Sequence, residues 1–136
     1  HSINDTSQEM ARESNPIATA LASLFHAYRN AVELDEKARY GEDDRANHVV
    51  GFIERYQVKF ENENTMEPVS AGRLLAALRR VGREFNLEFE YKKPAQLGRR
   101  ISNDLDVIRD TGFDIDRQRN AHTKNFEYRI IKTNSL

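Results

Sequence analysis

The chain of 136 residues contains no cysteine. This absence excludes disulfides, thiolate metal sites and cysteine nucleophiles, and it gives no sign of an oxidising compartment. No apolar run approaches the roughly 20 residues that cross a bilayer, and the first residues are polar. We therefore expect a cytoplasmic protein that does not bind membranes. Because the chain starts at His1 rather than Met, we expect a fragment of a longer protein or an added remnant at this end.

Motifs of catalytic chemistry are also missing. The sequence has no Walker loop, no G-x-G-x-x-G, no G-x-S-x-G and no H-x-x-E-H. His26, His48 and His122 are too scattered for a zinc site, and the acidic GEDD at 41 to 44 is explained more simply as a helix cap than as a cation site. We therefore predict a protein that is not an enzyme and that uses no cofactor or metal.

The net charge of −1 conceals two halves of opposite sign. Residues 1–69 hold 7 Lys and Arg against 13 Asp and Glu, whereas residues 70–136 hold 14 against 9. A basic second half is expected if only that half meets a polyanion. The alternative is that the two halves attract each other, or that the split is chance.

The first half predicts two helices. Residues 1–14 have no period and are expected to be a frayed terminus or an expression remnant. Residues 15–68 form a helical extension. In it, Asn15 caps a helix that begins at Pro16 and ends near Tyr40-Gly41, and Asp43 or Asp44 caps a second one. The apolar stripe of the second helix is Val49, Phe52, Ile53, Tyr56 and Phe60, and residues 61–68 are predicted to be a loop. The helical spacing of Tyr28, Phe52, Tyr56 and Phe60 favours core packing over ligand stacking.

The second half, residues 69–136, predicts a domain of its own. Val69-Ser70 opens a helix, residues 86–93 alternate like a strand, and Pro94 starts a further helix. A break at Ser102-Asn103 then precedes another helix, which ends at Gly112. The segments FDIDRQ and FEYRI alternate apolar and charged residues and predict a β-hairpin with a basic, flexible loop. This order predicts a mainly α fold with a small β-hairpin (α+β), a winged helix-turn-helix with an N-terminal helical extension.

Three motifs of this half resemble a known family. They are LLAAL at 74–78, LGRRI at 97–101 and IRDTG at 108–112. Over residues 69–132 they resemble the winged-helix domain at the C-terminal end of phage- and plasmid-type primase-helicase replication proteins. The resemblance implies an accessory domain that binds nucleic acid or a partner, and no ATPase or primase core accompanies it. In such domains the second helix is usually neutral or basic, whereas here it carries Asp104, Asp106 and Asp110, which repel phosphate.

Nucleic-acid binding requires guanidinium and ammonium groups placed over phosphates. The basic side chains that a winged helix could bring to one face are Lys92, Lys93, Arg99, Arg100, Arg109, Arg117, Arg119, His122 and Lys124. Arg99, Arg100 and Arg109 could instead pair with the three aspartates on a solvated surface, so the hairpin is the stronger candidate.

The sequence therefore predicts a DNA-binding accessory module that contacts duplex or forked DNA mainly through phosphates. One alternative is a protein-interaction module, in which the helices of residues 16–60 form a homodimer or dock on a larger partner. A second is a transcriptional regulator, which would need a dimer and a palindromic site.

Overall fold

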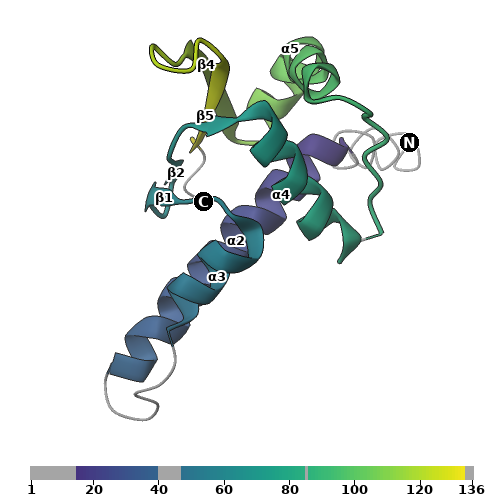
Figure 1. Ribbon diagram of the computed structural model, residues 1–136. Helices are drawn as coiled ribbons and strands as arrows, with labels where there is room; N and C mark the ends of the chain where they lie inside the picture. The colour runs from purple at the N-terminus through teal and green to yellow at the C-terminus, as the bar shows by residue number, and fades with distance from the viewer. Residues whose placement is uncertain (1–14, 40–46, 85, 134–136) are drawn as a thin grey trace, which may run out of the picture.

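Four helices and a five-stranded antiparallel sheet make up the part of the chain that the computed structural model describes, residues 15–39, 47–84 and 86–133. In chain order the elements are α2 (Pro16–Lys37), α3 (His48–Tyr56), β1 (Phe60–Asn62), β2 (Thr65–Met66), β3 (Val69–Ser70), α4 (Ala71–Arg83), α5 (Pro94–Asp110), β4 (Phe113–Arg119) and β5 (Phe126–Lys132). The mixed α+β class predicted from the sequence is confirmed. Figure 1 shows α2 and α3 as a helical pair that extends away from the hairpin of β4 and β5.

The long helix α2 begins as its sequence predicts. The Asn15 side chain accepts a hydrogen bond from the Ala18 backbone N–H at 3.1 Å, and Pro16 takes the first helical position. Phe60 stacks on Tyr28 of this helix with ring centres 4.1 Å apart, and it meets Phe25 edge to face at 4.9 Å. The predicted packing of these aromatic residues is therefore confirmed, although Phe60 reaches Tyr28 and Phe25 from a strand and not from a helix.

One strand, β5, organises the sheet. β4 pairs with it on one side, from Phe113 opposite Lys132 to Arg119 opposite Phe126. On the other side β2 and β3 both pair with it, and β1 adds to β2. Strand β3, which leads into α4, is thus paired with β5. This pairing holds the two ends of residues 69–133 together.

The hydrophobic core joins both predicted parts of the chain. Ile17, Leu21 and Leu24 of α2 lie in one cluster with Leu78 of α4 and Ile108 of α5, all fully buried. Ser70 caps α4 by accepting a hydrogen bond from the Arg73 N–H at 3.2 Å, and Pro94 opens α5. The division at residue 68 stays a prediction, but residues on both sides of it share this core.

Three local predictions are wrong. Residues 61–68, predicted as a loop, contain β2 and most of β1, and Phe60 lies in β1 rather than on a helix. Helix α3 ends at Gln57, which adopts a left-handed conformation with φ 59°. The chain changes direction there, so the four-residue step from Tyr56 to Phe60 does not follow one helix. The second helix is capped by Asn47. Asp43, Asp44 and the predicted stop at Tyr40-Gly41 lie outside the described residues.

Two further predictions in the second half are wrong. The alternating residues 86–93 form no strand, because this segment pairs with no strand and instead buries Phe89 against Gly82 of α4. Helix α5 runs without interruption through Ser102-Asn103. The predicted end at Gly112 is confirmed, since Gly112 follows the C-cap Thr111 with φ 98°.

Candidate nucleic-acid interface

The register of the hairpin separates its charges onto two faces. Because side chains alternate along a strand, Ile115, Arg117 and Arg119 share one face of β4, whereas Asp114 and Asp116 point to the other. Ile115 is buried in the core, and the strand continues outward from there. Arg117 and Arg119 therefore lie on the same face as Ile115 but past the edge of the core, where their side chains are exposed. The hairpin presents guanidinium groups on the side that faces the helices.

Helix α5 supplies the opposite wall of a groove. Its exposed residues Ala95, Arg99, Ser102 and Asn103 recur at steps of three and four and share one side of the helix. The hollow between α5 and the hairpin has a volume of about 370 Å³. It is lined by Ala95, Gly98, Arg99, Ser102, Asn103, Arg117, Phe126 and Tyr128. We refer to these residues as the α5–hairpin groove.

The spacing between the two walls is fixed at Gly98. A Cβ atom at this position would lie 2.5 Å from the hydroxyl oxygen of Tyr128, closer than atoms can pack. Both residues are buried. Glycine is therefore required for α5 to approach β5, and this approach brings Arg99 beside the hairpin.

Phe126 adds an aromatic surface to the groove. It is 47% exposed, and it is one of the few large apolar side chains at the surface. The guanidinium of Arg117 lies over its ring at 4.3 Å from the ring centre, a cation–π contact. Guanidinium groups beside an exposed ring suit both the phosphates and the bases of a nucleic acid.

Only some of the predicted basic residues meet in this groove. Arg99 and Arg117 line it, and Arg119 lies on the same face of the hairpin. Arg100 instead pairs with Asp104 at 3.1 Å, and Arg109 pairs with Asp114 at 3.0 Å. Lys92 and Lys93 are exposed just before α5, and His122 and Lys124 are exposed in the hairpin loop. The nine predicted residues thus fall into an open set and an ion-paired set.

Hydrogen bonds hold the hairpin loop that the sequence suggested to be flexible. The Asn120 side-chain oxygen accepts from the N–H groups of His122 and Thr123 at 2.8 and 3.0 Å. Arg119 donates to the Lys124 carbonyl at 3.1 Å, and Lys124 has φ 61°. The backbone of the tip is therefore hydrogen-bonded in a defined turn, and Arg119 is bound to it.

The aspartates of α5 do not all face the groove. Asp104 binds Arg100 and accepts a hydrogen bond from the Asn15 side chain at 3.1 Å, so it links α5 to the start of α2. Asp106 is exposed seven residues after Arg99 and hence on the same side of the helix, roughly 10 Å further along. Asp106 is thus the first aspartate after Arg99 on this side of α5.

Sequence reasoning missed three groove residues. Ser102 and Asn103 were interpreted as a helix break, and Phe126 only as a strand residue. Their signal was present: Ser102 and Asn103 follow Arg99 by three and four residues, the spacing of one helix face. Phe126 is offset from Arg117 by two positions in the hairpin register, which places the two on one face.

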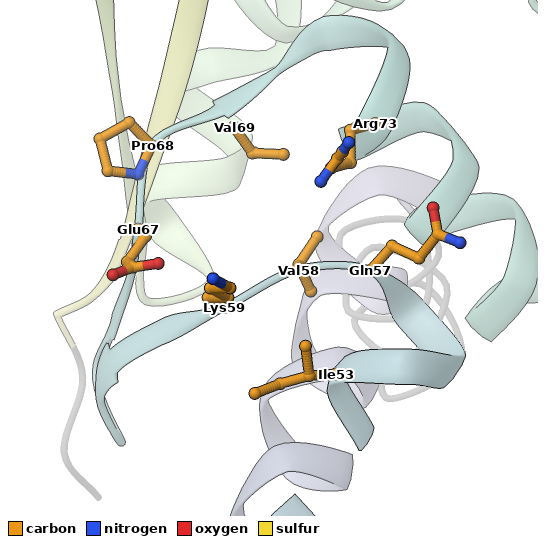
Figure 2. Close-up of a pocket in the computed structure, with 8 residues that line it drawn as sticks. All are labelled: Ile53, Gln57, Val58, Lys59, Glu67, Pro68, Val69 and Arg73. Carbon is orange, nitrogen blue, oxygen red and sulfur yellow. The ribbon is translucent and has the colours of Figure 1, made fainter. Parts of the chain in front are cut away.

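A larger hollow lies elsewhere and offers no comparable chemistry. Figure 2 shows it between the end of α3, the segment that leads into β1, the segment from β2 to β3, and the start of α4. Its volume is about 560 Å³. Lys59, Glu67 and Arg73 surround apolar walls that include Val58 and Val69. The charged groups of this hollow thus lie at its rim, around walls that are partly apolar.

Comparisons with protein-family models, with curated proteins and with solved structures give no match. Within residues 15–39, 47–84 and 86–133, no group of three or more His, Asp or Glu side chains is placed to hold a metal ion. No helix in this same part of the chain is long and apolar enough to span a membrane.

Proposed function

We propose that residues 69–136 form a winged helix-turn-helix that binds DNA without catalysing a reaction. The order of β3, α4, α5, β4 and β5 supports this proposal, with α4 and α5 as the helix pair and the hairpin as the wing. The segment between the two helices, residues 84–93, is longer than the three or four residues of a simple turn. In this arrangement α5 is the helix next to the DNA.

One observation carries the proposal. Arg99 of α5 and Arg117 of the hairpin line the same groove, and neither makes an ion pair with a described residue. A guanidinium left without a carboxylate is free to bind a phosphate, and two from separate elements define a path for a backbone. Ser102 and Asn103 line the same groove and offer hydrogen-bonding groups to base edges or sugars.

The chemistry of the groove favours duplex or forked DNA. The basic residues supply phosphate contacts, and the ring of Phe126 can stack on a base that is exposed at a duplex end or junction. The resemblance to the accessory domain of primase-helicase replication proteins agrees with such a substrate. We therefore propose a role as the DNA-binding module of a replication protein.

A triple substitution tests this function. Arg99→Gln, Arg117→Gln and Arg119→Gln together should lower the affinity for a short labelled duplex, measured by fluorescence anisotropy. The slope of log affinity against log salt should fall by about two to three, since each phosphate contact contributes about 0.9. As a control, Arg29→Gln with Lys37→Gln removes two positive charges from α2, away from the groove. Equal slopes for the triple variant and the wild type would refute the proposed site.

The second candidate function is a protein-interaction module. Leu34 and Val50 are 47% and 43% exposed, and they lie near the ends of α2 and α3 that the chain connects. These side chains could form part of a homodimer contact, although single exposed apolar residues are common. The molar mass in solution distinguishes the two. A dimer that Leu34→Ser with Val50→Ser dissociates, together with no DNA binding at low salt, would favour this alternative.

A further inference from the structure

The arginines of the described chain divide into two groups by their partners. Six form ion pairs with a carboxylate: Arg29, Arg39, Arg55, Arg100, Arg109 and Arg129. The others have no carboxylate of a described residue within ion-pair distance, and they gather at two places. Arg99, Arg117 and Arg119 belong to the α5–hairpin region, and Arg73, Arg79, Arg80 and Arg83 all belong to α4. The second cluster lies outside the site described above.

Helix α4 has an exposed side that is free of acidic residues. Its 13 residues, AGRLLAALRRVGR, contain four arginines and no Asp or Glu. The apolar side is buried through Leu74, Leu78 and Val81, which leaves the arginines on the other side together with two small residues. We refer to Gly72, Arg73, Ala76, Arg79, Arg80 and Arg83 as the arginine face. The side chains of Gly72 and Ala76 are small, so a phosphate backbone could approach the helix axis closely here.

The carboxylates near the arginine face leave most of its charge unmatched. Glu84 already accepts hydrogen bonds from Arg55 at 2.6 Å and from the Tyr56 hydroxyl at 3.0 Å. Glu88 and Glu90 border Arg79 and Arg83 at one edge, without an ion pair. Arg79 donates to the Tyr91 carbonyl. Arg73, Arg80 and Arg83 remain as guanidiniums with no described carboxylate partner.

The arginine face adjoins the groove. A Cβ atom at Gly72 would lie 3.6 Å from the ring of Pro94, so the start of α4 touches the start of α5. Ala95, the next residue, lines the α5–hairpin groove, and the exposed Lys93 precedes Pro94. Arg73 projects from the start of α4 over the hollow in Figure 2. Lys93 therefore lies near the junction of the two helices, and from Arg73 onward the arginine face runs along α4 beside the end of α3.

We propose that the arginine face of α4 is a second contact surface for the phosphate backbone of the same DNA duplex, so that the footprint extends beyond the groove. This inference rests on the proposed DNA binding. From Arg73 to Arg83 the helix rises about 15 Å, which spans roughly four phosphates of one strand. None of the six residues of the face is aromatic, so it lacks the rings on which successive unpaired bases stack, and a duplex is the better match.

Duplexes of about one and about two helical turns test this extension. Arg80→Gln with Arg83→Gln should leave the affinity for the shorter duplex within about twofold of the wild type. It should lower the affinity for the longer duplex by roughly tenfold or more and reduce its salt slope by about two. Arg80→Lys with Arg83→Lys retains the charge and should retain most of the binding. Arg29→Gln with Lys37→Gln is the matched control, and thermal melting verifies that each variant folds.

The outcomes separate the two proposals. A wild-type chain that binds neither duplex, or groove variants that bind both normally, would contradict the proposed function. If binding depends on the groove residues but the α4 variant lowers the affinities for the shorter and the longer duplex equally, only the extension to α4 is overturned. The same holds if the α4 variant lowers neither affinity. A single strand of the longer length that shows the same loss as the duplex would overturn the assignment to duplex DNA.

Discussion

The guanidinium of Arg117 lies 4.3 Å from the centre of the Phe126 ring, on the side of the hairpin that faces α5. The two residues are diagonal neighbours in the register of β4 and β5, which fixes them on one face. This contact holds a cation in the groove without neutralising it, because the partner is a ring and not a carboxylate. Charge and aromatic surface are thereby available to one ligand.

Replacing the ring tests whether the groove binds exposed bases. Phe126→Ala should lower the affinity for a forked duplex by roughly fivefold to a hundredfold, because stacking on one base contributes about 1–3 kcal/mol. The affinity for a blunt duplex should fall less. Since the ring is half exposed, the melting temperature should change little. Competition between forked and blunt DNA measures the difference, and an unchanged preference would count against base stacking.

The close approach of α5 to the hairpin makes Gly98 sensitive to substitution. Gly98→Ala should lower the stability by about 1–3 kcal/mol, because its Cβ would overlap the Tyr128 hydroxyl. Adding Tyr128→Phe removes that hydroxyl and should restore most of the loss. Chemical denaturation of the single and double variants measures the coupling. Additive effects of the two substitutions would show that the overlap does not fix the spacing of the groove walls.

The charge of Asp106 should weaken DNA binding. Asp106→Asn removes a carboxylate from the same side of α5 as Arg99, so the affinity for DNA should rise a few-fold as a repulsion to phosphate is lost. Asp116→Asn is the control, because it makes the same charge change on the opposite face of the hairpin. Anisotropy titrations compare the two. A gain of the same size in both variants would point to net charge instead of position.

Tyr56 should make stability depend on alkaline pH. Burial raises the pKa of its hydroxyl, and so do the hydrogen bond to Glu84 and the charge of that carboxylate. The folded state therefore holds this proton more tightly than the unfolded state. The resulting stability is complete below the usual pKa of 10.0 and is lost as the pH rises through the raised pKa. Tyr56→Phe should show a smaller fall in melting temperature at high pH than the wild type. An identical fall would exclude Tyr56 as its source.

The sequence correctly predicted those helices and strands in which the period of apolar residues matches the pattern of buried residues. β4, β5 and α4 have clear periods because one side of each lies on the core. Residues 86–93 show why period two alone is insufficient: Phe89 is buried and its neighbours are exposed, yet no strand pairs with them. β2 and β3 have two residues each, too few for any pattern, and only their pairing with β5, and for β2 also with β1, defines them.

The site could be predicted only in part, because basic residues along a chain do not reveal their partners. Arg99 and Arg100 are neighbours, but the helix turns one toward the groove and the other toward Asp104. The four arginines of α4 stand in the sequence without a sign of what they adjoin, and only the folded chain shows that the start of α4 touches the start of α5 at Gly72 and Pro94.

The comparison of Arg99→Gln with Arg100→Gln tests the central claim most directly. Both remove one positive charge from adjacent positions of α5, but only Arg99 lines the groove, whereas Arg100 is held by Asp104 at 3.1 Å. The salt dependence of duplex binding is the measurement. We predict that Arg99→Gln reduces the slope by about one unit and weakens binding, while Arg100→Gln leaves both nearly unchanged. Equal effects of the two substitutions would contradict a groove between α5 and the hairpin as the DNA-binding site.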